Sequence, residues 1–174
     1  MSARADSGQL YDVEVRIMKH GVAIIILLSL LSFGALDRLA AQSRLSRGPT
    51  VYVPVYSHIY YGDRDNHVMR LAATLSIRNI DLAKTITILS VDYYDTKGKL
   101  SERYLSAPVR LKSVESVRYI VKESDLRGGS GANFIVKWKA DVPANRPIIE
   151  AVMIGARGQQ GISFTSRGEE VIEK

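Results

Sequence analysis

The chain has 174 residues and a formal net charge of +6, with 24 lysines and arginines against 18 aspartates and glutamates. It contains no cysteine, which excludes disulfide bonds, a cysteine nucleophile, iron–sulfur clusters, a blue-copper thiolate and a lipid anchor attached to cysteine. The basic residues form no stripe and no recognition motif, so we expect no nucleic-acid partner.

A secretory signal is predicted near the N-terminus. A basic start at Lys19 leads into an uncharged apolar run of 16 residues, Gly21–Leu36, and small residues follow up to Ala41. A membrane-spanning helix needs about 20 apolar residues, so the run favours a cleavable signal helix over a permanent anchor.

Residues 1–41 are therefore expected to be an N-terminal extension and signal peptide. The leading residues are longer and more acidic than those of a typical signal, and translation starts either at Met1 or at Met18. The remaining domain is predicted to be periplasmic or secreted. Without cleavage, the signal segment would hold it to the membrane, which is the only membrane contact we expect.

From residue 42 onward, short strand-like runs alternate with turns. Residues 42–50 are polar and predict a linker. Val51–Tyr56 is rich in β-branched and aromatic residues, but Pro54 has no amide hydrogen, which predicts an edge strand or a bulged segment. The polar segment Ser57–Asn66 is expected to be a loop. Alternation over Arg70–Asn79 predicts a strand whose buried face carries Leu71, Ala73, Leu75 and Ile77.

The next run, Thr85–Tyr94, changes phase, because its apolar residues move from even to odd positions at Leu89. Such a slip indicates a β-bulge or a strand that is covered on both faces. Asp95–Gly98 is typical of a hairpin turn with glycine in the left-handed position, and Lys99–Tyr104 is the expected return strand.

The rest of the chain continues in the same way. A glycine-rich loop at Arg127–Asn133 precedes a strand with Phe134, Val136 and Trp138 on one face. Ile148–Gly155 is apolar at both parities and is expected to be central, whereas Gly161–Arg167 should turn Ile162 and Phe164 inward. Further short strands are expected around Val109–Leu111 and Val117–Val121.

These runs give eight or nine short strands and no convincing helix after the signal. We predict an all-β fold, a two-sheet antiparallel sandwich of immunoglobulin-like architecture preceded by an N-terminal signal helix. A small barrel is the second choice. The domain is expected to cover residues 51–168, with a C-terminal tail at 169–174.

One segment contains residue types that bind metal ions. Its candidate ligands are His58, Asp63, Asp65, His67 and Met69. His67 and Met69 are two residues apart and would share one strand face, an arrangement that suits copper, whereas the aspartates suit calcium without completing an EF-hand pattern. The alternative is a polar loop with an Asx turn.

The glycine-rich loop is the second candidate site, with Arg127, Gly128, Gly129, Ser130 and Asn133 as possible ligand-binding residues. Successive glycines expose backbone amides that can hold an anion, and an arginine would add charge. The spacing fits neither a hydrolase elbow, a phosphate-binding P-loop nor a dinucleotide loop. The alternative is a turn that leads into the next strand.

Nothing in the sequence singles out catalytic residues. His58 and His67 are the two histidines after residue 41, and the neighbouring Ser57 is no sign of a triad, because adjacent strand residues point apart. We expect no enzyme activity and no cofactor. A hydrolase using Ser130 or Asp92 remains a third hypothesis, after a binding module and a metal carrier.

Several segments together resemble a known family. VYVPVYSHIYYGDRDNHV, LAATLSIRN, VDYYDTKGKL, SDLRGGSGANFIVKW and EAVMIGARGQQGISFTSRG are similar to the bacterial family called domain of unknown function 3124, over roughly Val51–Gly168. The resemblance implies an exported bacterial protein and carries no activity, cofactor or catalytic residue.

The sequence therefore predicts an exported, non-enzymatic binding or structural module of the bacterial cell envelope. Its partner is expected to be an envelope protein or polymer that meets the 57–67 and 127–133 loops, because loops at the ends of such sheets usually carry recognition. The alternative is a periplasmic metal-binding carrier that uses His58, His67 and Met69.

Overall fold

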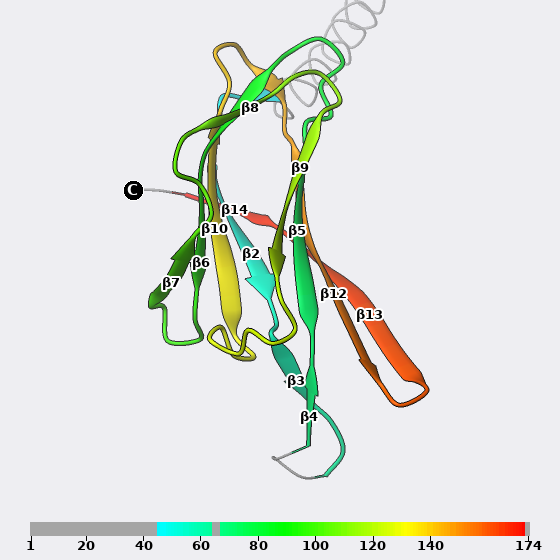
Figure 1. Ribbon diagram of the computed structural model, residues 1–174. Coiled ribbons are helices and arrows are strands. Elements are labelled where there is room, and N and C mark those ends of the chain that lie inside the picture. The colour runs from blue at the N-terminus through cyan, green and yellow to red at the C-terminus, as the bar shows by residue number, and fades with distance from the viewer. Residues whose placement is uncertain (1–44, 64–66, 173–174) are drawn as a thin grey trace, which may run out of the picture. The chain divides into compact units, whose positions relative to one another are not determined.

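A computed structural model describes residues 45–63 and 67–172 (Figure 1). All strand pairs in this part are antiparallel, and none of its residues is helical. The predicted all-β class is therefore confirmed, whereas the predicted signal helix lies outside the described residues. Within these ranges, no helix has the length and apolar character needed to cross a membrane.

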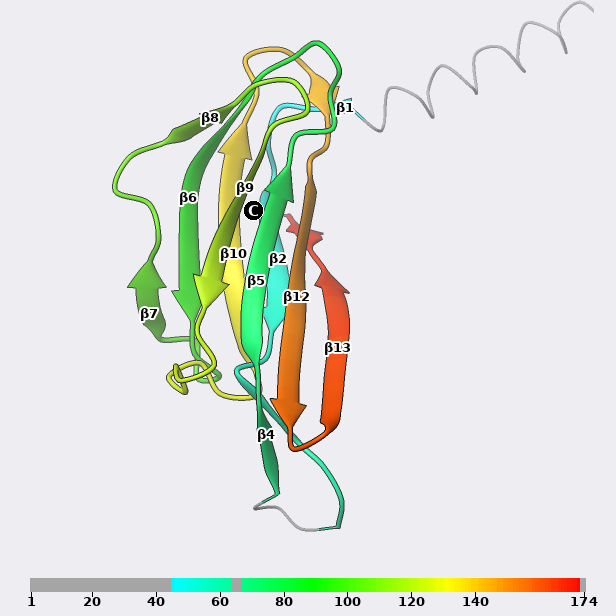
Figure 2. The same ribbon diagram turned by 45° about the vertical axis from the view of Figure 1, so that its right-hand side comes forward.

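The smaller of the two main sheets has four strands in the order β13-β12-β5-β9. Their bounds are Gln160–Arg167, Ile148–Arg157, Ala72–Arg78 and Ser116–Val121. The predicted central position of the segment beginning at Ile148 is confirmed, because β12 pairs with β5 on one side and β13 on the other. Strand β13 is an edge (Figure 2).

The larger sheet has six strands, in the order β14-β2-β10-β6-β7, with β8 also paired to β6. The bounds are Glu169–Val171, Thr50–Val55, Ala132–Lys139, Ile86–Tyr94, Leu100–Arg103 and Val109–Leu111. Two small two-stranded pairs complete the fold. They are β3 (His58–Tyr60) with β4 (Val68–Arg70), and β1 (Leu45–Ser46) with β11 (Ala144–Asn145).

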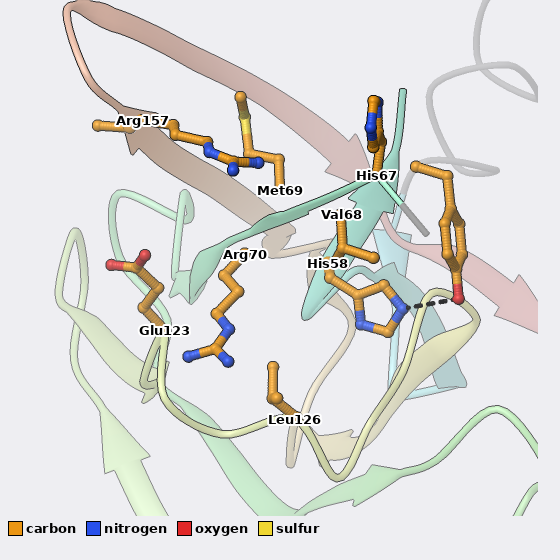
Figure 3. Close-up of a pocket in the computed structure, with 10 residues that line it drawn as sticks. His58, His67, Val68, Met69, Arg70, Glu123, Leu126 and Arg157 are labelled. Atoms are coloured by element: carbon orange, nitrogen blue, oxygen red, sulfur yellow. Dashed lines mark hydrogen bonds between the residues drawn. The ribbon is translucent and has the colours of Figure 1, made fainter. Parts of the chain in front are cut away.

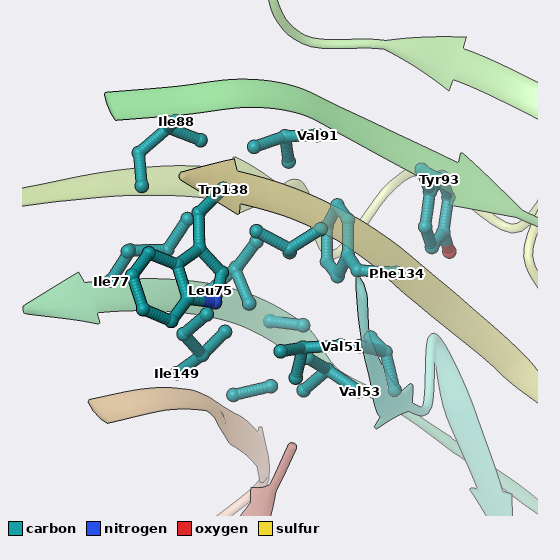
Figure 4. Packing of buried hydrophobic residues seen from close by; sticks show 14 of the residues in the cluster. Val51, Val53, Leu75, Ile77, Ile88, Val91, Tyr93, Phe134, Trp138 and Ile149 are labelled. Carbon is teal, nitrogen blue, oxygen red and sulfur yellow. The ribbon is translucent and has the colours of Figure 1, made fainter. Parts of the chain in front are cut away.

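Buried apolar side chains from both main sheets form one hydrophobic core (Figure 4). The core face predicted for this run is confirmed, because Ala73, Leu75 and Ile77 of β5 and Leu71 directly before it are fully buried. Alternate residues of β2, β6, β10 and β12 meet them from the other strands, as expected for strands with one covered face. The largest fully buried side chains are Tyr93, Phe134, Leu71, Leu75, Ile77, Ile86, Ile88 and Met153.

The phase change predicted in the run up to Tyr94 is a β-bulge. Strand β6 pairs with β10 as Ile88 opposite Trp138 and then Ser90 opposite Lys137, so Leu89 is the extra residue. Leu89 is exposed, whereas Ile88 and Val91 are fully buried. One inserted residue therefore restores the inward face on both sides of the slip.

Pro54 lies at a position of β2 where no neighbouring strand needs its missing amide hydrogen. The hydroxyl of Ser166 donates to the Pro54 carbonyl, so the backbone nitrogen and carbonyl of Pro54 face the side of β2 where β13 and β14 lie. Strand β14 pairs with β2 only over Thr50–Tyr52. The residue thus costs no ladder hydrogen bond, although β2 itself is not the outermost strand.

Three predicted boundaries are wrong. The supposed loop after Val55 contains β3, because His58 and Arg70 begin a short ladder between β3 and β4. The supposed linker contributes β1 and the first residue of β2, and the supposed tail contributes β14. Ile162, expected to be inward, is 38% exposed and lies on the edge strand β13, opposite Gly155.

The turn between β6 and β7 has the predicted form. Gly98 has a φ of 76°, and its amide donates to the Asp95 carbonyl at 2.9 Å. The Asp95 carboxylate accepts hydrogen bonds from the amides of Lys97 and Lys99 at 2.9 and 2.8 Å. These bonds place Thr96 at the end of the hairpin, where it meets the glycine-rich loop.

Candidate functional site

The two segments predicted to carry recognition contact each other. Ser57 donates two hydrogen bonds to the carbonyl oxygen of Gly129, from its backbone amide at 3.1 Å and from its hydroxyl at 3.0 Å. Ser57 is fully buried, so these bonds satisfy both of its donors away from water. The start of the β3–β4 hairpin is thereby attached to the glycine-rich loop.

The same loop is attached to the β6–β7 hairpin through Thr96. The amide and the hydroxyl of Thr96 both donate to the Gly128 carbonyl at 2.9 Å. The amide of Gly131 donates to the Thr96 hydroxyl oxygen at 3.0 Å. Several polar groups of the loop are therefore used within the protein, and the loop acts as a connector between two hairpins.

Arg127 does not offer its charge to an anion at the loop. Its guanidinium donates to Asp125 at 2.6 and 3.0 Å, to Glu102 at 2.7 Å and to the Ser101 carbonyl at 3.3 Å. Both carboxylates hold the pKa of Arg127 above its usual value, and the hydrogen bond from Arg127 holds the pKa of Asp125 below its own. Two negative partners surround this arginine.

The other residues proposed for the loop site belong partly to the loop and partly to the strand that follows it. Gly129 has a φ of 80°, which favours glycine, and Ser130 is half-buried. Asn133 lies in β10, where it pairs with Pro54 on one side and Tyr94 on the other. The structure thus joins Gly129 to Ser57 and Gly128 to Thr96 by hydrogen bonds. It does not gather the predicted residues around one ligand position.

The register of the β3–β4 hairpin divides its side chains between two faces. His58 pairs with Arg70 and Tyr60 pairs with Val68, so these four share one face. Ile59 pairs with Met69 and belongs to the opposite face. Figure 3 shows His58, Arg70 and Leu126 on one side of the hairpin and His67 and Met69 on the other.

A pocket of about 690 Å³ lies around this hairpin, and we call it the hairpin pocket (Figure 3). Residues of β3 and β4 meet the segment after β9 and the end of β12 around it. Its volume lies within the range of roughly 300–1,000 Å³ that is usual for small-ligand sites. It is lined by His58, Tyr60, His67, Val68, Met69, Arg70, Glu123, Leu126, Ala156 and Arg157.

Polar contacts hold part of the pocket wall in place. The Nη1 of Arg157 donates to the Tyr61 hydroxyl oxygen at 2.6 Å, joining the end of β12 to the hairpin. The ring centroids of Tyr61 and His67 are 5.5 Å apart. On the other face, Nε2 of His58 and the Tyr60 hydroxyl lie 3.3 Å apart and share a hydrogen bond.

The predicted metal ligands are divided by the hairpin. His67 and Met69 lie on one face, as the spacing predicted, but His58 lies on the other. Asp63 is exposed, and Asp65 lies outside the described residues. Within the described part of the chain, no three His, Asp, Glu or Cys side chains are grouped so that they could hold a metal ion.

Sequence reasoning did not find Arg70, Arg157, Glu123 or Leu126 as site residues. They come from β4, the end of β12 and the segment after β9, and more than fifty positions separate Arg70 from Glu123. No local motif joins them. The one available signal was the position of Arg70 at the end of an alternating strand, directly beyond the apolar core residues.

Comparison with known proteins gives three findings. A family model described as "Protein of unknown function (DUF3124)" matches residues 48–171, which confirms the resemblance seen in the sequence. A solved structure described as "Crystal Structure of Thermotoga maritima 1070" is similar, with 14% identity, a TM-score of 0.42, and coverage of 71% of this chain and 94% of that one. No curated protein matches the chain.

Proposed function

The chain belongs to the DUF3124 family of proteins of unknown function, and from this premise we propose that it is an exported, non-enzymatic binding module of the bacterial cell envelope. Export is supported by the uncharged apolar run Gly21–Leu36 with its basic start. A non-enzymatic role is supported by Ser57, whose hydroxyl donates to a backbone carbonyl instead of meeting His58 as part of a triad.

We further infer that the two main sheets form a sandwich of immunoglobulin-like architecture. The single core cluster to which both sheets contribute supports this inference. In such folds the sheets supply a rigid frame and the connections at the ends supply recognition. The β3–β4 hairpin and the glycine-rich loop are connections of this kind.

The observation that carries the proposed binding role is the hairpin pocket beside the contact between Ser57 and Gly129. Hydrogen bonds attach the hairpin to the glycine-rich loop and to β12, so the pocket wall is largely formed before a ligand arrives. A preformed concave site of this size loses little conformational entropy on binding. We propose that this pocket is where the module binds its partner or ligand.

Two experiments test the two parts of the proposal. Fractionation of the native cell, followed by detection of the chain, should find it in the envelope or periplasm and not in the cytosol. Recovery of the intact chain from the cytosol alone would contradict export.

The binding role is tested by capture from the native envelope with tagged full-length protein. Ala156 is exposed at the pocket, so Ala156→Trp should fill it and abolish capture, whereas Ala107→Trp, exposed between β7 and β8, should not. Equal capture by both variants would place the binding surface elsewhere.

A metal-binding carrier is the second candidate, and one observation favours it. His67 and Met69 lie on the same face of the hairpin, and both line the hairpin pocket. An imidazole and a thioether are ligands that copper accepts. His58 would have to act separately, because the strand register places it on the opposite face.

A further inference from the structure

The arginines of this region differ in how far their charge is already used. Arg127 meets two carboxylates, at 2.6 and 2.7 Å. Arg70 is exposed at the hairpin pocket, and among the described residues its guanidinium has neither a hydrogen-bond partner nor an ion-pair partner. An arginine without a protein partner at a concave site keeps all five donors available for a ligand.

The charge around Arg70 remains positive. Arg157 also lines the pocket, from the side of the hairpin that carries Met69 and not from the side of Arg70 (Figure 3), and its described partner is the neutral hydroxyl of Tyr61, which leaves its charge uncompensated. Among the described lining residues Glu123 is the one acid, so the lining carries two arginines and one glutamate. A positive concave site of this kind attracts anionic ligands and repels cations.

The rest of the wall suits a ring-shaped ligand with polar edges. Tyr60 is 56% exposed, and its hydrogen bond to His58 at 3.3 Å holds the phenol beside the pocket. The two rings are perpendicular, with centroids 5.2 Å apart. Val68 and Leu126 add apolar surface on the same side as Arg70. An amphipathic aromatic ring with apolar neighbours can stack against a sugar while its polar groups take hydroxyls.

We propose that the hairpin pocket binds an acidic saccharide, a sugar chain that carries carboxylate or phosphate groups. Arg70 pairs with the acid group, since the guanidinium fork matches carboxylate and phosphate oxygens. Tyr60 and Leu126 contact the sugar ring, and Arg157, on the other side of the hairpin, adds positive charge that attracts the acid groups over a longer range. This inference rests on the proposed binding role and names the ligand of the same pocket.

The test begins with an array that carries uronate-containing, phosphate-containing and neutral oligosaccharides, and it uses protein as recovered from cells. Acid-bearing saccharides of one or both kinds should bind, and their neutral counterparts should not. The tightest ligand is then titrated by calorimetry. Arg70→Gln should raise its Kd by about tenfold or more, since a charge-assisted pair is lost. Arg70→Lys should raise it less.

Arg103→Gln is the matched control, because Arg103 is exposed on β7 and lies 3.8 Å from Asp92, away from the pocket. It should leave the Kd unchanged, and all three variants should unfold at the same temperature as the parent protein. The affinity should also fall as salt rises.

The inference would be overturned if no acidic saccharide bound, if neutral sugars bound equally well, or if the Kd were unchanged in Arg70→Gln. Binding of polyglutamate as tight as that of the best saccharide would also overturn it, by showing an acidic-peptide site. If Ala156→Trp still abolishes envelope capture in any of these cases, the proposed binding role is kept and only the proposed ligand class is wrong.

Discussion

Gly128 lies against the phenol ring of Tyr93 so closely that a side chain at position 128 has no space. A Cβ added to Gly128 would be 1.8 Å from the Tyr93 hydroxyl oxygen and 2.6 Å from its Cζ. Gly128 is buried, and Tyr93 is completely buried. Close packing therefore explains this glycine without an anion.

Gly128→Ala should lower the free energy of unfolding by about 1–3 kcal/mol, the usual cost of overpacking a tight site. Gly161→Ala is the control, because the nearest atom to a Cβ there is the Gly155 carbonyl oxygen at 3.8 Å. Urea unfolding of both variants measures the difference. Equal stabilities would show that the loop moves away from Tyr93 without cost.

Tyr93→Phe should leave the protein as stable or make it more stable, by up to about 1 kcal/mol. The buried Tyr93 hydroxyl has no hydrogen-bond partner among the described residues, so its removal relieves an unsatisfied polar group. Tyr104→Phe is the comparison, because the Tyr104 hydroxyl donates to the Ile120 carbonyl at 3.2 Å. Chemical unfolding at pH 7 measures both, and a clear loss in Tyr93→Phe alone would reveal a missing partner.

The same residue predicts a loss of stability in alkali. Burial raises the pKa of Tyr93 to about 12, from an ordinary value of 10.0. Because the folded pKa is higher than the unfolded one, the stability of the folded state that depends on a neutral Tyr93 is fully present below pH 10 and declines as the pH rises towards 12. Between about pH 9 and 11.5, the free energy of unfolding should decline less steeply for Tyr93→Phe than for the parent protein.

Because of the β-bulge, substitutions at the neighbouring residues Ile88 and Leu89 should differ in their effect on stability. Ile88→Ala should cost about 2–5 kcal/mol, since Ile88 is fully buried, whereas Leu89→Ala should cost less than about 1 kcal/mol, because Leu89 is the exposed extra residue. Thermal unfolding of the two variants measures this contrast. A larger loss in Leu89→Ala would mean that the slip lies one residue away.

Asp81 should contribute stability that disappears in acid. Its carboxylate accepts hydrogen bonds from the amides of Asn145, Ala83 and Lys84, at 2.9–3.0 Å, and these bonds lower its pKa below the ordinary 3.8. The contribution is therefore present above about pH 4 and lost as the pH falls through the lowered folded value.

Asp81→Asn should reduce the free energy of unfolding at pH 7 by about 1–3 kcal/mol, because an amide nitrogen in place of Oδ2 cannot accept the bonds that the backbone and side-chain amides of Asn145 donate there. The difference from the parent protein should shrink at pH 3. Asp141→Asn, at an exposed position, is the control and should have little effect at either pH. A constant difference across the pH range would contradict the assigned cause.

Metal binding, where it occurs, should not require both histidines of the hairpin. Because His58 and His67 lie on opposite faces, a copper ion held by His67 and Met69 should be lost in His67→Ala and kept in His58→Ala. Titration followed by elemental analysis measures the bound equivalents. Loss of metal in both variants would require a hairpin register different from the one described.

The sequence predicted the strand interiors well, because alternation directly reports which face is covered. The buried face of β5 and the bulge at Leu89 were both readable in the order of apolar residues. The short strands β3 and β14 were missed, since three residues are too few to show a period. Their pairing is decided by partners distant in the chain.

The candidate site was predictable only in part. The two recognition segments were predicted to form one binding surface, and the hydrogen bonds between Ser57 and Gly129 show that the segments contact each other. Their recognition role stays a prediction. The ion pair between Arg127 and Glu102 was not predicted, because Glu102 lies on β7, 25 positions earlier in the chain. Arg70 was missed because no local motif joins it to the other residues that line the hairpin pocket, which come from β12 and from the segment after β9.

Strands β2 and β14 have a mechanical consequence for a tethered protein. Thr50 at the start of β2 is paired with Val171 at the end of β14. Tension applied through the residues before 50 and after 171 would load this antiparallel pair at one end, so its hydrogen bonds would break one after another instead of sharing the force. The β14 strand would peel off first at low load, while the buried strands β6 and β10 stayed intact.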